Sequence, residues 1–193
     1  MAKSIAVLVG SLRKESFNRK MAKQLIALAP ETLKLEIIEI GALPLYNQDL
    51  DDHPPAAWIE FRRRLKQSDG VLFVTPEYNR SVPGVLKNAI DIGSRPYGQS
   101  AWEKKPGAVI SVSPSQIGGF GANQHLRQSL VFLDVPCMQQ PEAYIGGAAE
   151  LFDSEGKIKN ESTRAFLRNF MESYANWVAT FTEKRSAGVK AAS

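Results

Sequence analysis

The first stretch of the chain that could do chemistry follows a short apolar run at residues 5–9. Between Gly10 and Asn18 it carries hydroxyl groups, a side-chain amide and a guanidinium. These groups belong to Ser11, Arg13, Ser16 and Asn18. Neutral donors, a planar cation and the free amides of a helix N-terminus are the groups that bind phosphate. The stretch therefore predicts a phosphate cradle between a strand and a helix.

This cradle differs from two common phosphate-binding loops. The sequence has no G-x-x-x-x-G-K-[ST] motif, and no G-x-G-x-x-G follows the first apolar run. Because hydroxyls stand where those loops have glycines, the stretch favours a terminal phosphate monoester over a pyrophosphate. The alternative interpretation is that Ser16 only caps the helix and that Arg13 is a solvated charge.

A second loop, residues 75–84, follows the third apolar run. Pro76 and Pro83 stiffen it, and Tyr78 and Asn79 lie between them. A rigid backbone that offers amides, carbonyls and an aromatic side chain suits the edge of a flat conjugated ring. The alternative is an ordinary turn before a helix.

A third loop, residues 113–121, begins with Ser113 and contains Gly118 and Gly119. Glycine permits either a close approach of the backbone to a ligand or a left-handed turn. The sequence leaves both possibilities open.

Other reactive residues do not form a recognisable site in the sequence. His53 lies in a proline-rich loop and His125 in an expected helix, without a second histidine or cysteine at ligand spacing, which argues against zinc. Glu77 is more simply an exposed loop carboxylate than a general base. Cys137, the single cysteine, lies in an apolar stretch and is expected to pack in the core. We therefore nominate no catalytic side chain and no metal ligand.

The loops need a scaffold, and the apolar runs predict one. Runs of strand length are expected at residues 5–9, 35–40, 71–75, 108–112 and 143–145. Helical patterns are expected around Met21, Leu25 and Leu28, at residues 58–65, from near Pro83, at residues 122–133, and in a last helix near the end of the chain. This alternation is typical of a three-layer, doubly wound α/β domain with a five-stranded parallel sheet.

The last helix has the clearest pattern because aromatic residues repeat along it at helical spacing. They are Phe166, Phe170, Tyr174, Trp177 and Phe181. Such a stripe is expected to form a face of the core.

The topology and the loops indicate the same place. In open parallel sheets, ligands bind beyond the carboxyl ends of the strands, where the strand order reverses. The three loops follow the first, third and fourth expected strands, so we expect them to converge there.

Length and charge limit the classes of protein that remain. The 193 residues, 44% of them hydrophobic, suit one domain, which we place at residues 1–183, followed by a flexible basic tail at 184–193. No apolar stretch approaches the roughly 18 residues of a membrane span, and a cytoplasmic location is expected. The net charge of +4 favours anionic partners, but no basic block interleaved with aromatics indicates nucleic acid.

Two motifs together carry a family resemblance. G-S-L-R-K-E-S-F-N at residues 10–18 is followed by P-E-Y-N-R-S-V-P-G-V-L-K-N-A-I-D at residues 76–91. With this pair the chain resembles the NADPH-dependent FMN reductases and is most similar to their bacterial quinone and chromate reductase branch. The resemblance extends over almost the whole chain.

The resemblance implies a flavodoxin-like sheet of order 2-1-3-4-5, tightly bound FMN and NADPH or NADH as co-substrate. By position it implies an FMN site made of Ser11, Arg13, Ser16 and Asn18 at the phosphate, Pro76, Glu77, Tyr78 and Asn79 along the ribityl chain and ring, and Ser113, Gly118 and Gly119 on the far side of the ring. Arg80 and Arg95 would attract an anionic acceptor or the nucleotide phosphate. Members of the family are commonly homodimers or homotetramers.

The expected activity is an FMN-dependent NAD(P)H oxidoreductase that acts on quinones, with chromate or other oxidants as side acceptors. One alternative is an electron carrier of flavodoxin type that a partner reductase charges. Such carriers tend to be acidic and to lack an arginine in the phosphate loop, so the positive charge and Arg13 favour the enzyme. Another alternative is a reductase that releases free reduced FMN.

Overall fold

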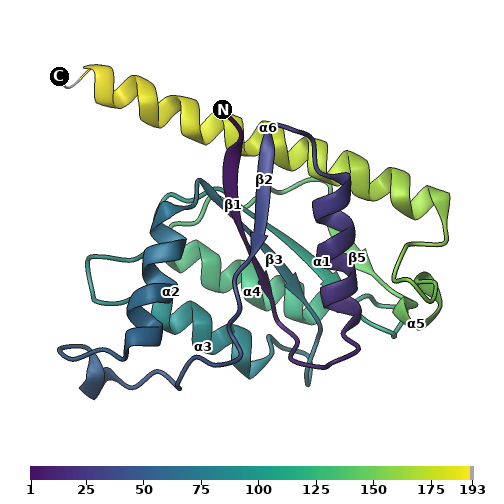
Figure 1. Cartoon of the computed structure of the whole chain (residues 1–193), viewed down its shortest axis with the longest axis horizontal. Helices are drawn as coiled ribbons and strands as arrows, with labels where there is room; N and C mark the ends of the chain where they lie inside the picture. The colour runs from purple at the N-terminus through teal and green to yellow at the C-terminus, as the bar shows by residue number, and fades with distance from the viewer. Residues whose placement is uncertain (192–193) are drawn as a thin grey trace.

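A five-stranded, all-parallel sheet of order β2-β1-β3-β4-β5 forms the centre of the molecule (Figure 1). The structure is a computed structural model that describes residues 1–191, with side chains up to residue 182. The strands are β1 (Lys3–Val9), β2 (Leu33–Ile37), β3 (Gly70–Thr75), β4 (Gly107–Val112) and β5 (Ala143–Ile145). The prediction of a doubly wound parallel sheet with this strand order is confirmed.

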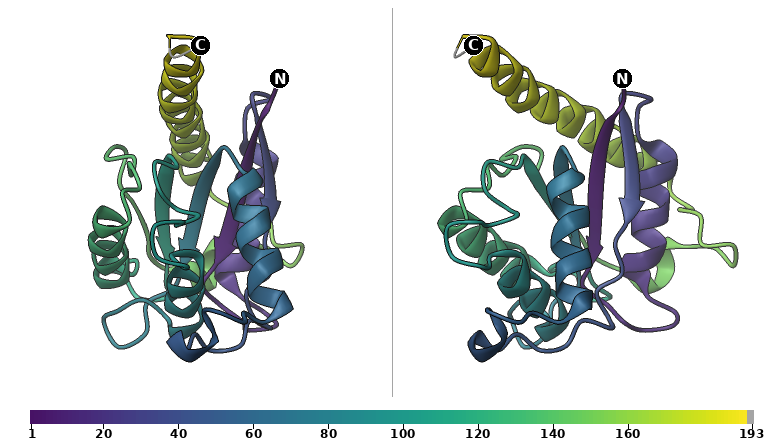
Figure 2. Two further views of the ribbon diagram at one scale, coloured as in Figure 1. Left: turned by 90° about the vertical axis from the view of Figure 1, so that its left-hand side faces the viewer. Right: turned by 60° about the vertical axis from the view of Figure 1, so that its left-hand side comes forward.

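Helices cover both faces of the sheet. They are α1 (Phe17–Leu28), α2 (Ala56–Gln67), α3 (Gly84–Gly93), α4 (Phe120–Phe132), the short α5 (Ala148–Leu151) and α6 (Glu161–Ala191), with a 3₁₀ turn, η1 (Gln48–Leu50), before α2. The helices α1 and α6 pack on one face, and α2, α3 and α4 pack on the other. The left view of Figure 2 looks onto the sheet through α2 and α3, which lie in front of it.

Burial of the strands follows from these two helical layers. All six residues of β3 and all six of β4 are buried, as expected for central parallel strands covered on both sides. Along β1, alternate side chains enter different cores. Val7 packs with α1 and α6, whereas Ala6 and Leu8 pack with α2 and α3.

The second strand differs from its prediction. It occupies Leu33–Ile37 rather than residues 35–40. Ile38 and Ile40 are buried, but they pack against the α2 and α3 core from a loop that has left the sheet. Their apolar character therefore reflects packing beneath a helix and not strand pairing.

The aromatic stripe of α6 is only part of its buried face. Phe170 and Tyr174 are fully buried, as predicted, together with the aliphatic Leu167, Met171 and Val178. Phe166, Trp177 and Phe181 are half-buried at the margin of the core. The buried seam thus follows the 3.6-residue period of the helix and is shared by aromatic and aliphatic side chains.

The domain boundary at residue 183 remains a prediction. The backbone of α6 continues as helix to Ala191, whereas residues 192–193 and the side chains from residue 183 onward lie outside the described part. Among the helices of residues 1–191, none is long and apolar enough to cross a membrane.

Tyr174 fastens α6 to the sheet. Its buried hydroxyl donates to the carbonyl of Val71 at 2.9 Å and lies 3.2 Å from the carbonyl of Pro106. Burial raises the pKa of this hydroxyl well above its ordinary value, so it stays a donor. Gly70 leaves room for it, because a Cβ there would lie 2.8 Å from the hydroxyl oxygen.

We expect Tyr174→Phe to lower the free energy of unfolding by about 1–2 kcal/mol, because buried carbonyls lose their donor. Denaturant titration of the purified protein measures this change. The matched control is Tyr97→Phe, since the Tyr97 side chain is 88% exposed and its variant should unfold like the parent. Equal stability of Tyr174→Phe and the parent would contradict the role given to this hydroxyl.

Candidate functional site

Three loops meet at the edge of the sheet where the strands end. The first loop (residues 10–16) follows β1, the second (76–83) follows β3 and the third (113–119) follows β4. These strands are direct neighbours in the sheet, so their carboxyl ends lie side by side at the lower edge in Figure 1. The strand order reverses between β1 and β3, which is where such sheets bind ligands.

The first loop leads into α1 through Ser16. The Ser16 hydroxyl accepts a hydrogen bond from the backbone N–H of Arg19 at 3.2 Å, which makes it the N-cap of α1. A hydroxyl that accepts can still donate its own proton, so capping leaves Ser16 able to bind a ligand oxygen. Ser11 and Ser16 are buried, whereas Arg13 is exposed and its guanidinium lies 5.9 Å from the centre of the Phe17 ring.

Asn18 carries the clearest sign of a missing partner. Its side-chain Nδ2 donates to the carbonyl of Val112 at 3.1 Å, which ties the first loop to the end of β4. Its Oδ1 is buried and has no hydrogen-bond partner. Leaving a buried acceptor unpaired costs about 1–3 kcal/mol. Asn18 therefore offers an acceptor to a ligand hydroxyl, while the second N–H of its amide remains available to a ligand oxygen.

The second loop is built around a tight turn. The backbone N–H groups of Tyr78 and Ser81 each donate to the other residue's carbonyl, at 3.1 and 2.9 Å. Between them, Asn79 and Arg80 have positive φ angles of 51° and 62°, as in a type I′ turn. Tyr78, Asn79 and Arg80 are therefore exposed at the tip, whereas Pro76 is half-buried at the base.

Glu77 is wrongly interpreted as an exposed loop carboxylate. Its side chain is only 12% exposed. One carboxylate oxygen accepts from the backbone N–H of Ala122 at 3.1 Å, and the other accepts from the Arg80 guanidinium at 3.1 Å. Glu77 thus satisfies an otherwise unpaired amide in the first turn of α4 and joins the second loop to that helix.

The glycines of the third loop face the protein itself. Gly118 and Gly119 have φ angles of 65° and 76°, which is left-handed backbone. A Cβ on Gly118 would also lie 2.6 Å from the carbonyl carbon of Tyr144 in β5. Both possibilities left open by the sequence therefore apply to Gly118, with β5 as the close neighbour. Ser113 is fixed as well, since its N–H donates to the carbonyl of Ile145 at 2.9 Å.

Apolar side chains surround the loops, and the sequence reasoning missed them. Each belongs to a loop or a helix start at the carboxyl end of the sheet and is about half exposed or more. They are Leu12, Leu45, Tyr78, Ile117 and Phe120, which we call the apolar rim. Large apolar residues inside otherwise polar loops were the available signal.

The two arginines proposed for an anionic acceptor lie at opposite ends of a helix. Arg80 stands at the tip of the second loop, before the start of α3. Arg95 follows the end of α3, about 15 Å farther along a helix of this length, and its guanidinium lies 5.7 Å from the centre of the Tyr46 ring. The structure therefore brings only Arg80 to the loops.

Cys137 and His125 take part in packing contacts. Burial raises the pKa of the Cys137 thiol, and its sulfur lies 3.5 Å from the Arg127 guanidinium. His125 Nδ1 lies 3.0 Å from the Ser81 hydroxyl, a contact that joins α4 to the second loop. Within residues 1–182, no cluster of three or more His, Cys, Asp or Glu side chains could hold a metal.

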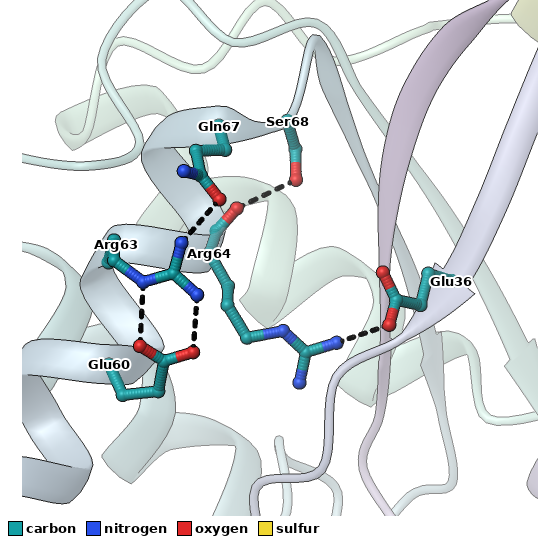
Figure 3. A network of polar contacts seen from close by, with 6 residues as sticks. All are labelled: Glu36, Glu60, Arg63, Arg64, Gln67 and Ser68. Carbon is teal, nitrogen blue, oxygen red and sulfur yellow. Dashed lines mark hydrogen bonds and ion pairs between the residues drawn. The ribbon is translucent and has the colours of Figure 1, made fainter.

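A polar hollow of about 260 Å³ between α2 and the first strands also contains arginines. Figure 3 shows that each of them is already engaged. Arg63 binds both oxygens of Glu60 at 2.6 Å, and Arg64 binds Glu36 at 2.7 Å. Because carboxylates neutralise both guanidinium groups, this hollow is a poor site for an anion.

The residues at the strand ends fit the predicted cofactor. A helix N-terminus, two serine hydroxyls and Arg13 suit a phosphate, and the unpaired Asn18 Oδ1 suits a hydroxyl of an attached sugar-like chain. The apolar rim suits a flat ring. A phosphate, a hydroxylated chain and a flat ring are the three parts of FMN.

Comparison with known proteins supports this fit. The family model for NADPH-dependent FMN reductase matches residues 4–150. A quinone reductase of Pseudomonas putida is 67% identical over 176 residues, which are 91% of this chain and 94% of the relative. A 2-hydroxy-1,4-benzoquinone reductase of a Burkholderia species is 49% identical over 178 residues, which are 92% and 97% of the two chains.

A solved structure shares both the fold and much of the sequence. It is FerB, a flavoenzyme NAD(P)H:(acceptor) oxidoreductase of Paracoccus denitrificans. It matches with a TM-score of 0.88 and 43% identity, over 93% of this chain and 99% of its own.

We expect the double variant Arg13→Ala, Ser16→Ala to bind FMN at least about tenfold more weakly, because charge-assisted bonds to phosphate are lost. Titrating the flavin-free protein with FMN measures the dissociation constant. The matched control is Arg63→Ala, Ser68→Ala, which removes the same residue types from α2 outside the loops. FMN binding by the loop variant at the parent's strength would rule out the phosphate cradle.

Proposed function

Because this chain belongs to the NADPH-dependent FMN reductase family, we propose that it reduces quinones with NADPH or NADH. It is an oxidoreductase that uses FMN as cofactor. The relatives that are named quinone reductases, at 67% and 49% identity, support quinones as the acceptors.

The structural observation that carries the proposal is the apolar rim. A quinone is flat, neutral and largely apolar, so exposed apolar side chains beside the loops favour its binding. Part of this rim is held in a fixed arrangement. The rings of Phe120 and Tyr144 lie 5.2 Å apart, and Gln124 donates to the Tyr144 hydroxyl at 2.6 Å. The acceptor therefore meets a surface that needs little reordering.

When bound, FMN supplies the hydride-transfer chemistry, and the protein supplies binding and orientation. Ser11, Ser16, Arg13 and the N-terminus of α1 would hold the phosphate. Asn18 would accept a hydrogen bond from a hydroxyl of the ribityl chain, which would satisfy its buried Oδ1. Pro76, Tyr78 and Asn79 would line the ring on one side, and the third loop, from Ser113 to Gly119, would line it on the other. We assign no general acid or base.

Glu77 has a positioning role in this proposal. Its two carboxylate oxygens hold the start of α4 and the tip of the second loop at the same time. It would keep the two loops on either side of the ring at a fixed separation. This role differs from direct contact with the ribityl chain, which remains a prediction from the family resemblance.

Chromate and other small oxidants are proposed as side acceptors. Arg80, exposed at the tip of the second loop, is the cation that would attract an anionic oxidant. A cytoplasmic location and an assembly of two or four copies remain predictions from the sequence.

We expect NADPH or NADH to bleach the visible flavin band rapidly when mixed with the purified protein in the absence of oxygen, and benzoquinone to restore it. Stopped-flow absorbance measures both phases. Slow bleaching by both nucleotides would favour the electron carrier over the enzyme. Ultrafiltration after reduction provides the control for the third possibility, because flavin in the filtrate would indicate release of free reduced FMN.

We expect Arg80→Gly to raise the KM for chromate by about threefold to tenfold, since one exposed charge is lost, and to leave the KM for neutral benzoquinone unchanged. Glycine suits the positive φ of 62° at this position, so the turn is preserved. Arg63→Ala is the control, because Arg63 is an exposed arginine on α2 that pairs with Glu60. An equal KM for chromate in Arg80→Gly and the parent would exclude Arg80 from acceptor binding.

A further inference from the structure

An exposed apolar patch lies at the far ends of α3 and α4 from the candidate site. It consists of Tyr97, Val131 and Phe132, which we call the α3–α4 patch. Their side chains are 88%, 79% and 88% exposed. Val131 and Phe132 are in the last turn of α4, and Tyr97 is in the loop that follows α3. Neighbouring large apolar side chains with this exposure mark a surface that another molecule covers.

The patch combines a projection with a recess. Phe132 lines a hollow of about 390 Å³ together with Tyr97 and Asp134. It also lines a second hollow, of about 360 Å³, together with Lys87 and Ser129. The same exposed ring therefore stands beside recesses on both sides.

We infer that the α3–α4 patch is the contact surface for a second copy of this chain, with Phe132 of each copy entering a recess of the other. A two-fold dimer uses the same surface twice, so that surface must hold both a projecting group and a recess that fits it. An aromatic anchor in a pocket is also the arrangement that contributes most to binding between proteins.

The charges around the patch fit the same partner. Lys87 and Arg95 line the hollows, and so do Asp91, Glu103 and Asp134. Both signs are present, so a two-fold arrangement can place cations of one copy opposite anions of the other. A strongly acidic or basic partner, or an anionic lipid surface, would instead favour a patch of one sign.

The position of the patch keeps the partner away from the loops. The starts of α3 and α4 follow the second and third loops, whereas the patch is at the opposite ends of both helices. These helices have 10 and 13 residues, so they separate the patch from the loops by about 15–20 Å. Two copies joined here would each keep the strand-end edge open to nucleotide and acceptor.

Sedimentation velocity of the FMN-loaded protein from the nanomolar to the high micromolar range tests the inference. We expect the parent to contain two copies, or four if a further interface exists. Phe132→Glu should weaken the dimer at least about a hundredfold, so that the mass falls by half at concentrations where the parent is assembled. A parent that sediments as one copy throughout, or a variant with the parent's mass, would overturn it.

The control is Ile59→Glu, which introduces the same charge at an apolar residue that is 52% exposed on α2. This variant should keep the parent's mass. Tyr97→Asp is a second test from a different element and should dissociate the protein as Phe132→Glu does. Circular dichroism and thermal unfolding check that each variant folds, and if Phe132→Glu fails to fold, the mass of Tyr97→Asp decides.

Discussion

Hydrogen bonding between parallel strands is the constraint on which the rest of the structure depends. Since all five strands run in the same direction, their carboxyl ends must share one edge, and each connection must return across a face of the sheet. The returning helices bury both faces, which is why β3 and β4 contain only buried residues. Loops that are up to about 100 residues apart in sequence are thereby brought into one site.

Contacts between neighbouring strands then fix the loops at this edge. The Asn18 amide holds the first loop to the end of β4, and the Glu77 carboxylate holds the second loop to the start of α4. Gly118 lets the third loop press against β5. A site of this kind binds its cofactor with little loss of loop entropy, because the folded sheet has already ordered the loops.

Helices α3 and α4 separate two kinds of surface. Their starts carry the second and third loops, and their ends carry the α3–α4 patch. The opposite face of the sheet is different, because α1 and α6 close it with a continuous core in which Tyr174 also satisfies backbone carbonyls. The fold thus has one face that is fastened by a long helix and another that presents cofactor loops and an exposed apolar patch.

The sequence by itself determined the features that depend on local order. Apolar runs and helical spacing predicted the parallel sheet, and the residues from Ser11 to Asn18 predicted a phosphate site, because strand patterns and helix caps involve neighbours in the chain. Only the tertiary structure decided the burial of Glu77, the separation of Arg80 from Arg95, the aliphatic share of the α6 seam and the apolar rim. These features depend on contacts between residues such as Glu77 and Ala122, whose proximity is set by strand order and helix packing and leaves no periodic signal in the sequence.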